Sequence, residues 1–577
     1  MDRVPDRSAR ERLRTGLAEH RWSVLAGGLL VLPILGAVLT LPGGRPWYAT
    51  DDWAIELAHT ADVGGRHTPL VGVYSRFGWY HPGPLLYWVL APFEHAFGPK
   101  GMLAGTGLVN AFALAGVVVF AHRRGGTQLA VLAAAVGAVL CRSLALGVHP
   151  GFVVDPWNPE IALLPFLLLL LLAWSVLCED WPALPWMVGV ASFIVQTHIG
   201  YAPLAIGMPA FATGWRGIAW WHRRRAQAVT DTPQPLPLRS LVVAGSIGVV
   251  LWLAPVIQQL SGHPGNLGAL FHYFTHPAEH PLGVSRGLGV MGRELAFPGP
   301  WINGHDSPSP NYIVGGSILP GALLTTIVAT LGVLAWRRGH RDAGRLAALA
   351  VADVGLGIFT VSRIVGTVYP YLVFWTWIIG AVLWLSIIWS AWCLLASVRI
   401  VDRAMSVAAP ASLAVLTLAN GHRFVPSTVP QSTYSRQVAT LLRHVTPHLD
   451  PGRTYLVDTS KDVHVGAGLG LELQRRDYTV ELEADLAFKF GSWRVATGSR
   501  PDAILMVVDE NIVGMNWRPP PRSRLLASAG LLTLPELRLE KLLRSQASRA
   551  HGHHRPDARL AKLREKAQKV DVYLVTR

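Results

Sequence analysis

Long apolar segments, separated by short basic stretches, follow one another along this 577-residue chain up to about residue 421. Many of them reach the roughly 20 apolar residues that an α-helix needs to cross a bilayer. We therefore predict a mainly α fold, a polytopic transmembrane helical bundle of about 11 spans within residues 23–421. The predicted spans lie at about 23–42, 101–121, 127–147, 160–178, 240–260, 313–335, 344–362, 370–394 and 403–419, with two more sharing 184–221 as a tight hairpin.

One further apolar segment, residues 84–97, is short and contains Pro92, Glu94 and His95. These features favour a helix that lies in the membrane interface over one that crosses the bilayer. With this assignment, the arginine pair at 123–124 follows an inward-running span and lies in the cytoplasm, as basic loop residues usually do.

Charge and composition support the membrane class. Only 15% of the residues are charged, against about 25% in soluble domains, and 51% are hydrophobic. The net charge of +15 comes with arginine clusters beside apolar segments, which is the positive-inside pattern rather than a nucleic-acid-binding face. Residues 1–22 are then cytoplasmic, and an odd number of spans makes the C-terminus extracytoplasmic. We expect a multi-pass protein of the cell inner (plasma) membrane with no nucleic-acid partner.

From about residue 422 the composition becomes that of an ordinary soluble domain, with none of the three cysteines and so no disulfide. Its roughly 150 residues are a normal domain size. We predict an extracytoplasmic α/β domain over residues 422–577. The expected strands lie at 454–459, 478–483, 503–509 and 570–576, and the expected helices at 432–446 and 534–546.

The predicted first outer loop, residues 43–100, is too long and too rich in charged and aromatic residues for a simple connector, and a later outer loop, 261–312, is rich in His, Gly and Pro. The first loop carries two adjacent carboxylates, Asp51 and Asp52. One could remove the proton from an acceptor hydroxyl while its neighbour fixes its orientation. The structural alternative is a helix start, because Thr50 and the two acids precede WAIELAH. The two roles are compatible, and we predict Asp51 and Asp52 as catalytic residues.

A second polar outer stretch, HPGFVVDPWNPE, follows the third span and carries His149, Asp155, Asn158 and Glu160. A second acid that shares a cavity with the first would suit acceptor or metal binding, which makes Asp155 a candidate. The alternative for Asp155 is an Asx-type turn before the following proline.

Polar residues also lie where a span should be apolar. Gln196 and His198 would face a cavity or form hydrogen bonds between spans. Arg363, at the outer end of a span, suits a lipid-linked phosphate through its planar guanidinium, with an interfacial anchor as the alternative. The predicted acceptor- and donor-binding residues are Asp155, His81, Arg76, Gln196, His198, Arg363 and Tyr369.

Two motifs are set aside. The run GAGLG at 466–470 lacks the full GxGxxG pattern and lies in a domain predicted to be outside, where no dinucleotide pool is expected. The histidine-rich run at 551–554 fits a solvated basic tail better than a metal site. The metal ligands stay unknown, so no cofactor is predicted outright, and a divalent metal ion is the one candidate.

These residues, in this order, resemble the GT-C superfamily of integral-membrane glycosyltransferases. The likeness is closest to the branch that holds protein O-mannosyltransferases and lipid A aminoarabinose transferases. Those families place an acid in the first outer loop, as Asp51-Asp52 here, and then a Pro-rich interfacial segment, as HPGPLLYWVLAPFEHAFG at 81–98. A second acid follows the third span, where Asp155 is the candidate. The likeness covers about 23–260 by motifs and 313–419 by layout.

The resemblance implies a GT-C-like fold and an inverting sugar transfer from a polyprenyl-phosphate donor to an extracytoplasmic glycan, lipid or protein acceptor. An aspartate of the first outer loop would act as general base, and Arg363 or a metal would stabilise the leaving polyprenyl phosphate. The composition suggests an actinobacterial source, where such enzymes serve cell wall biogenesis. A transporter or flippase for a lipid-linked or envelope precursor is the main alternative, and a non-catalytic scaffold of the same fold is the third.

Overall fold

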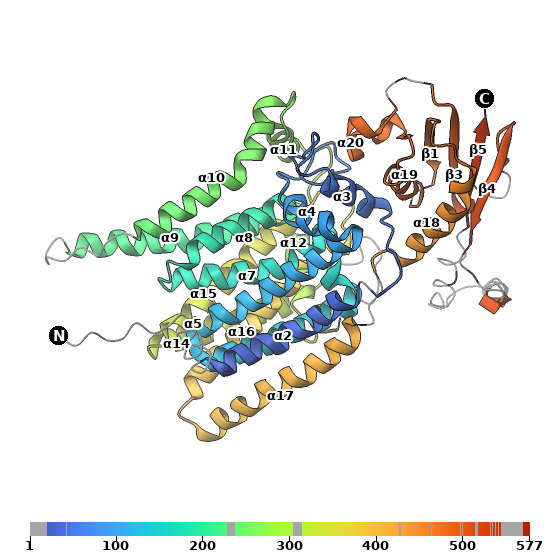
Figure 1. The fold of residues 1–577 in the computed structure, drawn as a ribbon. Coiled ribbons are helices and arrows are strands. Elements are labelled where there is room, and N and C mark those ends of the chain that lie inside the picture. Colours follow the sequence, from blue (N-terminus) through green and yellow to red (C-terminus); the bar gives the residue numbers. More distant parts are fainter. Residues whose placement is uncertain are drawn as a thin grey trace, which may run out of the picture. The chain divides into compact units, whose positions relative to one another are not determined.

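The computed structural model (Figure 1) describes residues 20–41, 43–227, 237–303, 314–425 and 429–576, the last range with gaps at 463, 497, 499, 514–516 and over most of 531–568. The predicted cytoplasmic N-terminus is almost wholly outside these residues, as is the histidine-rich run at 551–554. The chain forms two compact units. The helical unit comprises residues up to 42, 70–89 and 103–427, and the sheet unit comprises 43–69, 90–102 and 428–577.

The helical unit confirms the prediction of a mainly α, polytopic bundle. Helices occupy every predicted span position, and eight of the helices within the described residues are long and apolar enough to cross a membrane. Figure 1 shows the long helices running roughly side by side. They are α2 (Arg21–Thr40), α5 (Pro99–Gly147), α7 (Leu163–Leu177), α8 (Ala183–Thr197), α9 (Ala202–Gln227), α10 (Leu238–Ser261), α14 (Leu319–Arg337), α15 (Arg341–Ser362), α16 (Trp375–Leu395) and α17 (Arg399–Phe424).

Shorter helices connect these spans. The predicted interfacial helix is α4 (Leu85–Phe97), whose 13 residues are too few to cross a bilayer. The long loop expected at 261–312 contains three helices that periodicity did not indicate. The short helices of this part of the chain are η1 (Phe152–Val154), α6 (Asn158–Ile161), η2 (Ile199–Tyr201), α11 (Asn266–Thr275), α12 (Val284–Glu294), α13 (Pro300–Asn303) and η3 (Pro370–Leu372).

Helix α7 lies at the centre of the bundle. All 15 of its residues are buried, and it packs against α8, α9, α15 and α16. Its sequence, LLPFLLLLLLAWSVL, has no polar face, and a helix that is apolar all round belongs in the interior.

Helix α5 is a hairpin rather than one continuous rod. Gly125 and Gly126 have non-helical backbone angles, and Gly126 has a φ of +63°, which favours glycine. A Cβ atom on Gly137 would lie 3.8 Å from Leu114, so the two halves pack alongside each other. The two predicted spans at 101–121 and 127–147 are therefore both present.

The hairpin predicted over 184–221 forms from unequal helices. At 15 residues α8 is about 22 Å long, shorter than the hydrocarbon core of a bilayer, while the 26-residue α9 continues to Gln227. The helix therefore extends past the predicted hairpin end at residue 221 and includes Arg223–Arg225.

Acidic residues at one end of the bundle are neutralised by the arginine clusters. Arg123 donates from Nε to Asp180 Oδ2 at 2.8 Å, and Arg124 lies 3.4 Å from the same carboxylate. Arg216 contacts Glu179 at 2.6 Å. The acidic turn between α7 and α8 thus shares its end of the unit with arginines of α5 and α9.

The sheet unit is an α/β domain with five described strands in the order β2-β1-β3-β5-β4. Strands β1, β2 and β3 are parallel, and β5 is antiparallel to both β3 and β4. All four predicted strands are present. Strand β4 was not predicted, because it is an edge strand whose sequence, SRLLASA, has no continuous apolar run. The strands are β1 (Tyr455–Lys461), β2 (Val480–Leu482), β3 (Ala503–Asp509), β4 (Ser523–Ala529) and β5 (Val570–Thr576).

Helices on the sheet complete this unit. The predicted helix at 432–446 is α18, whereas most of the one predicted at 534–546 falls outside the described residues. Helix α19 packs against β1, β2, α3 and α18. The helices are α3 (Asp51–Ala61), α18 (Ser432–Val445), η4 (Thr446–His448), α19 (Gly466–Gln474), η5 (Ala484–Leu486), α20 (Ala487–Phe490), η6 (Ser492–Arg494) and α21 (Glu510–Val513).

Candidate functional site

Asp51 is held at two points by one histidine of the sheet unit. The Nδ1 atom of His464 donates to Asp51 Oδ2 at 3.0 Å, and the main-chain N–H of Asp51 donates to the carbonyl oxygen of His464 at 3.2 Å. Asp51 has a φ of +51°, a left-handed conformation that costs energy for a residue other than glycine. The two hydrogen bonds stabilise this conformation and so fix the direction of the carboxylate.

Asp51 and Asp52 form the first turn of α3, with Thr50 as the N-cap residue. The helix start considered as the structural alternative is therefore real, and acids are favourable there because of the helix dipole. A helix start does not exclude a catalytic role for these two acids. Asp51 is half-exposed, and its Oδ1 atom makes no hydrogen bond within the described part of the chain, so that oxygen can accept a proton.

The surroundings of His464 favour its charged form. Tyr434 stacks on its ring with 4.4 Å between centroids. The hydrogen bond to Asp51 raises the pKa of His464, and the negative charges of Asp462 and Asp509 raise it further against the opposing effect of burial. A larger share of His464 is therefore imidazolium at neutral pH, which makes its hydrogen bond to Asp51 charge-assisted.

The GAGLG run serves packing rather than nucleotide binding. The Asp462 carboxylate accepts hydrogen bonds from the main-chain N–H groups of Val465 and Gly466, so an internal anion already occupies the N-terminus of α19. A Cβ atom on Gly468 would lie 2.4 Å from the carbonyl oxygen of Ala49. Glycine here lets α19 approach the segment that leads into Asp51.

Ion pairs tie the early segments of the sheet unit to its tail. Arg494 contacts Asp62 at the end of α3 at 2.6 Å, and Arg475 contacts Glu94 of α4 at 2.9 Å. Glu94 and Asp62 are both largely buried, so these pairs are worth more than surface ion pairs. The Arg494–Asp62 pair thus holds the end of α3, and His464 holds its start.

In the helical unit, the loop after α5 brings His149, Asp155 and Glu160 together. His149 Nε2 lies 3.1 Å from Asp155 Oδ2 and 3.0 Å from Glu160 Oε2. Asp155 also accepts a hydrogen bond from the N–H of Trp157 at 3.0 Å, which is the Asx-type turn considered for it. Although burial lowers the pKa of His149, the charges of Glu160 and Asp155 outweigh it and raise that pKa well above its usual value.

This triad has the donor set of a metal site. Asp155 and Glu160 are 1% and 5% exposed, and two buried carboxylates with one imidazolium leave an excess negative charge. A divalent cation in place of the ring proton would make the cluster neutral. One ligand atom from each residue lies within 4.8 Å of the others, and one nitrogen with two oxygens suits Zn²⁺ or Mn²⁺ with positions left open.

A hairpin of the first outer loop positions Arg76 and His81. Antiparallel hydrogen bonds join Gly72 to His81 and Ser75 to Trp79, so Arg76 lies at the tip and His81 at the base. Arg76 is exposed and lies over the ring of Tyr369 at 5.1 Å, which brings two predicted binding residues together. Ring contacts extend from there to the loop of Asp155. Arg76 also lies 4.9 Å from the Phe77 ring, Tyr369 stacks on Tyr371 at 5.7 Å, and Tyr371 contacts Trp157 at 4.9 Å.

His81 and His198, both predicted as binding residues, lie with 4.7 Å between ring centroids and their planes tilted by 34°. Each accepts a hydrogen bond at Nδ1, His81 from the N–H of Ile199 and His198 from that of Gly200. Both rings therefore carry their proton on Nε2. Burial, helped by the neighbouring histidine, lowers the pKa of His81 well below its usual value, so this ring is a neutral donor.

Gln196 makes the hydrogen bond between helices that was the alternative to a cavity-facing role. Its Nε2 donates to the carbonyl oxygen of Leu251 in α10 at 2.8 Å. Pro255 follows four residues later in α10 and has no N–H, so Leu251 lacks its helical partner. Gly83 packs against the same side chain, since a Cβ atom there would lie 2.1 Å from Gln196 Oε1.

Arg363 lies at the C-terminus of α15, is exposed and forms no ion pair with any described residue. It is available to an anion, as the sequence suggested, and equally to water. His464 and Tyr434 were missed, and no local signal could have found them, because His464 is 413 residues from Asp51. Glu160 was noted beside Asp155 but not selected, since only the fold of the loop shows that both reach His149.

Together the fold and these clusters define a polytopic helical protein with a small α/β domain and carboxylate–histidine sites in both units. Comparison with known proteins adds a distant likeness. No family model matches the chain, and no curated protein matches it. Among solved structures it is similar to ArnT from Cupriavidus metallidurans. The crystal structure of ArnT bound to undecaprenyl phosphate gives 12% identity, a TM-score of 0.49 and coverage of 95% of this chain and 97% of that one. The apo structure gives 13% identity, a TM-score of 0.49 and coverage of 86% and 94%.

Proposed function

We propose that this protein is a membrane glycosyltransferase that moves a sugar from a polyprenyl-phosphate donor to an acceptor hydroxyl of the cell envelope. One observation carries the proposal, the two-point attachment of Asp51 to His464 at the start of α3. A general base must be held in one direction, and this carboxylate has one oxygen bonded and the other available.

The reaction balances with these groups alone. The acceptor oxygen forms a bond to the anomeric carbon of the sugar, and the bond from that carbon to the phosphate oxygen breaks. The acceptor proton passes to Asp51 or Asp52, and the polyprenyl phosphate leaves with the electron pair. A phosphate leaving group is already an anion and needs no proton, so one base is sufficient. Attack opposite the leaving group inverts the anomeric configuration.

Exposed cationic groups of the helical unit can bind a phosphate. Arg76 at the hairpin tip and Arg363 at the end of α15 are both exposed and free of ion pairs with described residues. A guanidinium suits a phosphate because its planar N–H groups can bind two oxygens at once. The ring of Tyr369 stabilises the position of Arg76 through a cation–π contact.

The test is a transfer assay with purified protein in proteoliposomes. A panel of radiolabelled polyprenyl-phosphate sugars is offered with an envelope extract as acceptor, and release of sugar from the lipid is measured. General bases contribute about 10²- to 10⁴-fold, so Asp51→Asn or Asp52→Asn is expected to lower the rate at least about 100-fold. Asp477→Asn, at an exposed position of the same unit, is the control and should leave the rate unchanged. Full rates in both test variants would reject the assignment of the base.

A transporter of an envelope precursor is the second candidate, and Asp353 of α15 favours it. This side chain is 0% exposed, and neither carboxylate oxygen has a hydrogen-bond partner within the described part of the chain. An acid buried at membrane depth often belongs to a proton or ion pathway. Transport of a lipid-linked sugar across vesicles that survives Asp51→Asn but is lost in Asp353→Asn would favour this candidate over the transferase.

A further inference from the structure

The sheet unit contains a cavity whose lining residues do not include Asp51 or His464. A cavity of about 840 Å³ lies between the segment that precedes α3, helix α18 and the C-terminal end of α19. This volume is within the range of about 300–1,000 Å³ typical of small-molecule sites. We call it the arginine cavity. Its polar lining residues are Arg45, Tyr48, Arg436, Thr440, Arg443, Thr446, Arg476 and Tyr478.

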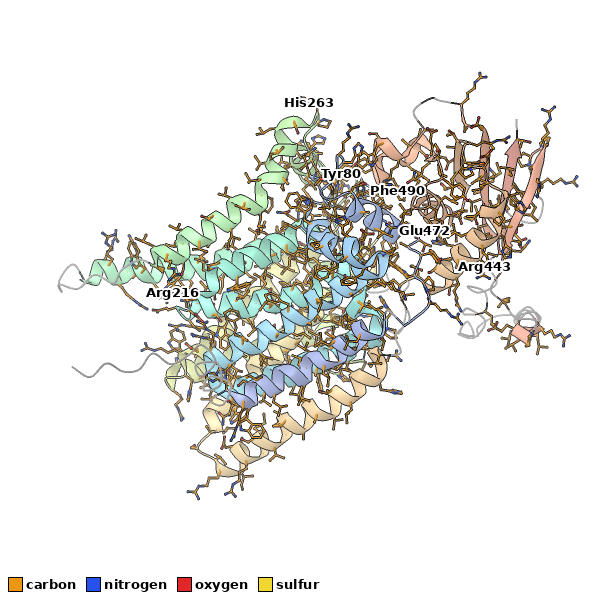
Figure 2. The ribbon with its side chains drawn as sticks, viewed as in Figure 1. Tyr80, Arg216, His263, Arg443, Glu472 and Phe490 are labelled. Atoms are coloured by element: carbon orange, nitrogen blue, oxygen red, sulfur yellow. The ribbon has the colours of Figure 1, made fainter. Side chains whose placement is uncertain are left out.

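Three of the four charges of this lining are uncompensated within the described residues. Four arginines and no acidic residue line the cavity. Arg476 is paired with Glu472 of α19, but Arg45, Arg436 and Arg443 form no ion pair with any residue that the structure describes. Figure 2 marks Arg443 on α18 and Glu472 on α19. Cations gathered around one cavity repel each other, and a bound anion relieves that repulsion.

Two of the arginines lie on the same face of helix α18. Arg436 and Arg443 are seven residues apart in α18, so their Cα atoms are separated by about 10.5 Å along the axis and project from the same side. Thr440 lies between them on that face and adds a hydroxyl. This row can bind a ligand longer than a single phosphate.

Aromatic rings complete the lining. Tyr48 and Tyr478 contribute flat surfaces, and Arg476 lies over the Tyr48 ring at 5.7 Å. The main-chain N–H of Tyr48 donates to Ser435 of α18 at 2.8 Å, which fixes this wall of the cavity. Rings beside guanidinium groups suit a ligand that joins an anionic group to a sugar or another ring.

A solvated basic surface is the plain alternative, but two features count against it. The lining groups come from three separate segments and converge on one hollow, whereas a solvated face needs no such convergence. The positive-inside rule does not account for these arginines either, because they belong to the domain predicted to be outside the cell.

We infer that the arginine cavity binds a phosphate monoester or diester attached to a sugar or polyol. The phosphate contacts Arg436, Arg443 and Arg45, and the attached ring lies against Tyr48 and Tyr478. The same phosphate chemistry is offered by soluble sugar phosphates and by lipid headgroups. The inference does not depend on the proposed transferase activity, because binding alone is measured.

The test uses the full-length protein in a neutral detergent and isothermal titration. The probes are glucose 1-phosphate, inorganic phosphate, and mixed micelles that contain phosphatidylglycerol, with glucose as the uncharged control. Each charge-assisted contact is expected to contribute about tenfold in affinity, so Arg436→Gln with Arg443→Gln should weaken phosphate binding at least about tenfold. The matched control is Arg453→Gln, which removes the same charge from an exposed turn outside the cavity.

Binding of glucose 1-phosphate that is lost in the double variant and kept in the control supports the inference and identifies a soluble ligand. The same pattern with phosphatidylglycerol micelles alone supports it and identifies a lipid headgroup. The inference is overturned if the wild-type protein binds none of the phosphate probes, if the double variant binds as wild type does, or if Arg453→Gln weakens binding equally. Thermal unfolding without ligand checks that the variants fold, and loss of repulsion should leave their Tm equal or higher at low salt.

Discussion

The hydrogen bond from Gln196 to the carbonyl of Leu251 gives the sharpest stability prediction. Gln196 is 0% exposed, and its Nε2 supplies the donor that Pro255 cannot. Replacement by leucine keeps the volume but leaves the Leu251 carbonyl without a partner, at membrane depth where water cannot compensate. An unsatisfied buried acceptor costs about 1–3 kcal/mol, while hydrogen bonds between membrane helices average about 0.6 kcal/mol. We expect Gln196→Leu to lower the free energy of unfolding by about 1 kcal/mol.

The proline makes this prediction testable by a double-mutant cycle. Pro255→Ala restores an N–H four residues after Leu251, so that the carbonyl regains a helical partner. In the Pro255→Ala background, Gln196→Leu should cost close to nothing, and it also removes the unpaired Oε1 atom of the glutamine. The coupling energy is therefore about 1 kcal/mol, a roughly fivefold effect on the unfolding equilibrium.

The assay is denaturant-induced unfolding of the purified protein in mixed micelles, for the wild type, both single variants and the double variant. Equal costs of Gln196→Leu in the two backgrounds would refute the role assigned to the proline. Transfer activity of the double variant separates structure from binding. Activity that stays low although stability is restored would favour the sugar-binding role that the sequence suggested for Gln196.

Three further outcomes follow from the sites. His464 has a raised pKa, so its contact with Asp51 stabilises α3 most at low pH and less as pH rises from about 6.5 through the raised pKa. Hydrogen exchange of the α3 amides should therefore show a larger loss of protection in His464→Gln at pH 5.5 than at pH 9, and an equal loss at both pH values would contradict this. Gly468→Ala places a Cβ atom 2.4 Å from the Ala49 carbonyl and should destabilise the sheet unit by about 1–3 kcal/mol, measured as a lower Tm, whereas an unchanged Tm would show that α19 can shift. Binding of Mn²⁺ to the purified protein should weaken the sharp electron paramagnetic resonance signal of the free ion, and His149→Ala should restore that signal; equal weakening in this variant would contradict the metal site.

The sequence predicted the helical fold well because hydrophobic segments are a strong signal at membrane length. The helices at the predicted span positions, the α4 helix and four strands all follow from local composition. Edge strand β4 was not predicted because three of its seven residues are exposed and need no apolar side chain. The short helices between α10 and α14 were not predicted because their glycine, proline and histidine content is typical of loops.

The candidate site was predictable only in its local parts. Asp51 and Asp52 follow a span and precede an apolar run, which a reader of the sequence can see. Their partner His464 cannot be predicted in this way, because its contact with Asp51 depends on the tertiary fold of the sheet unit. The same holds for Arg76 and Tyr369, which are distant in sequence and meet through ring geometry.

The central claim is that the Asp51–Asp52 pair takes a proton from an acceptor on the outer face of the membrane. The most direct test is labelling of single cysteines at positions 51 and 52 in intact cells with a membrane-impermeant thiol reagent, after removal of the three native cysteines. The account predicts labelling from outside, without permeabilisation. Labelling that requires opened cells would place the pair on the cytoplasmic side and contradict the account.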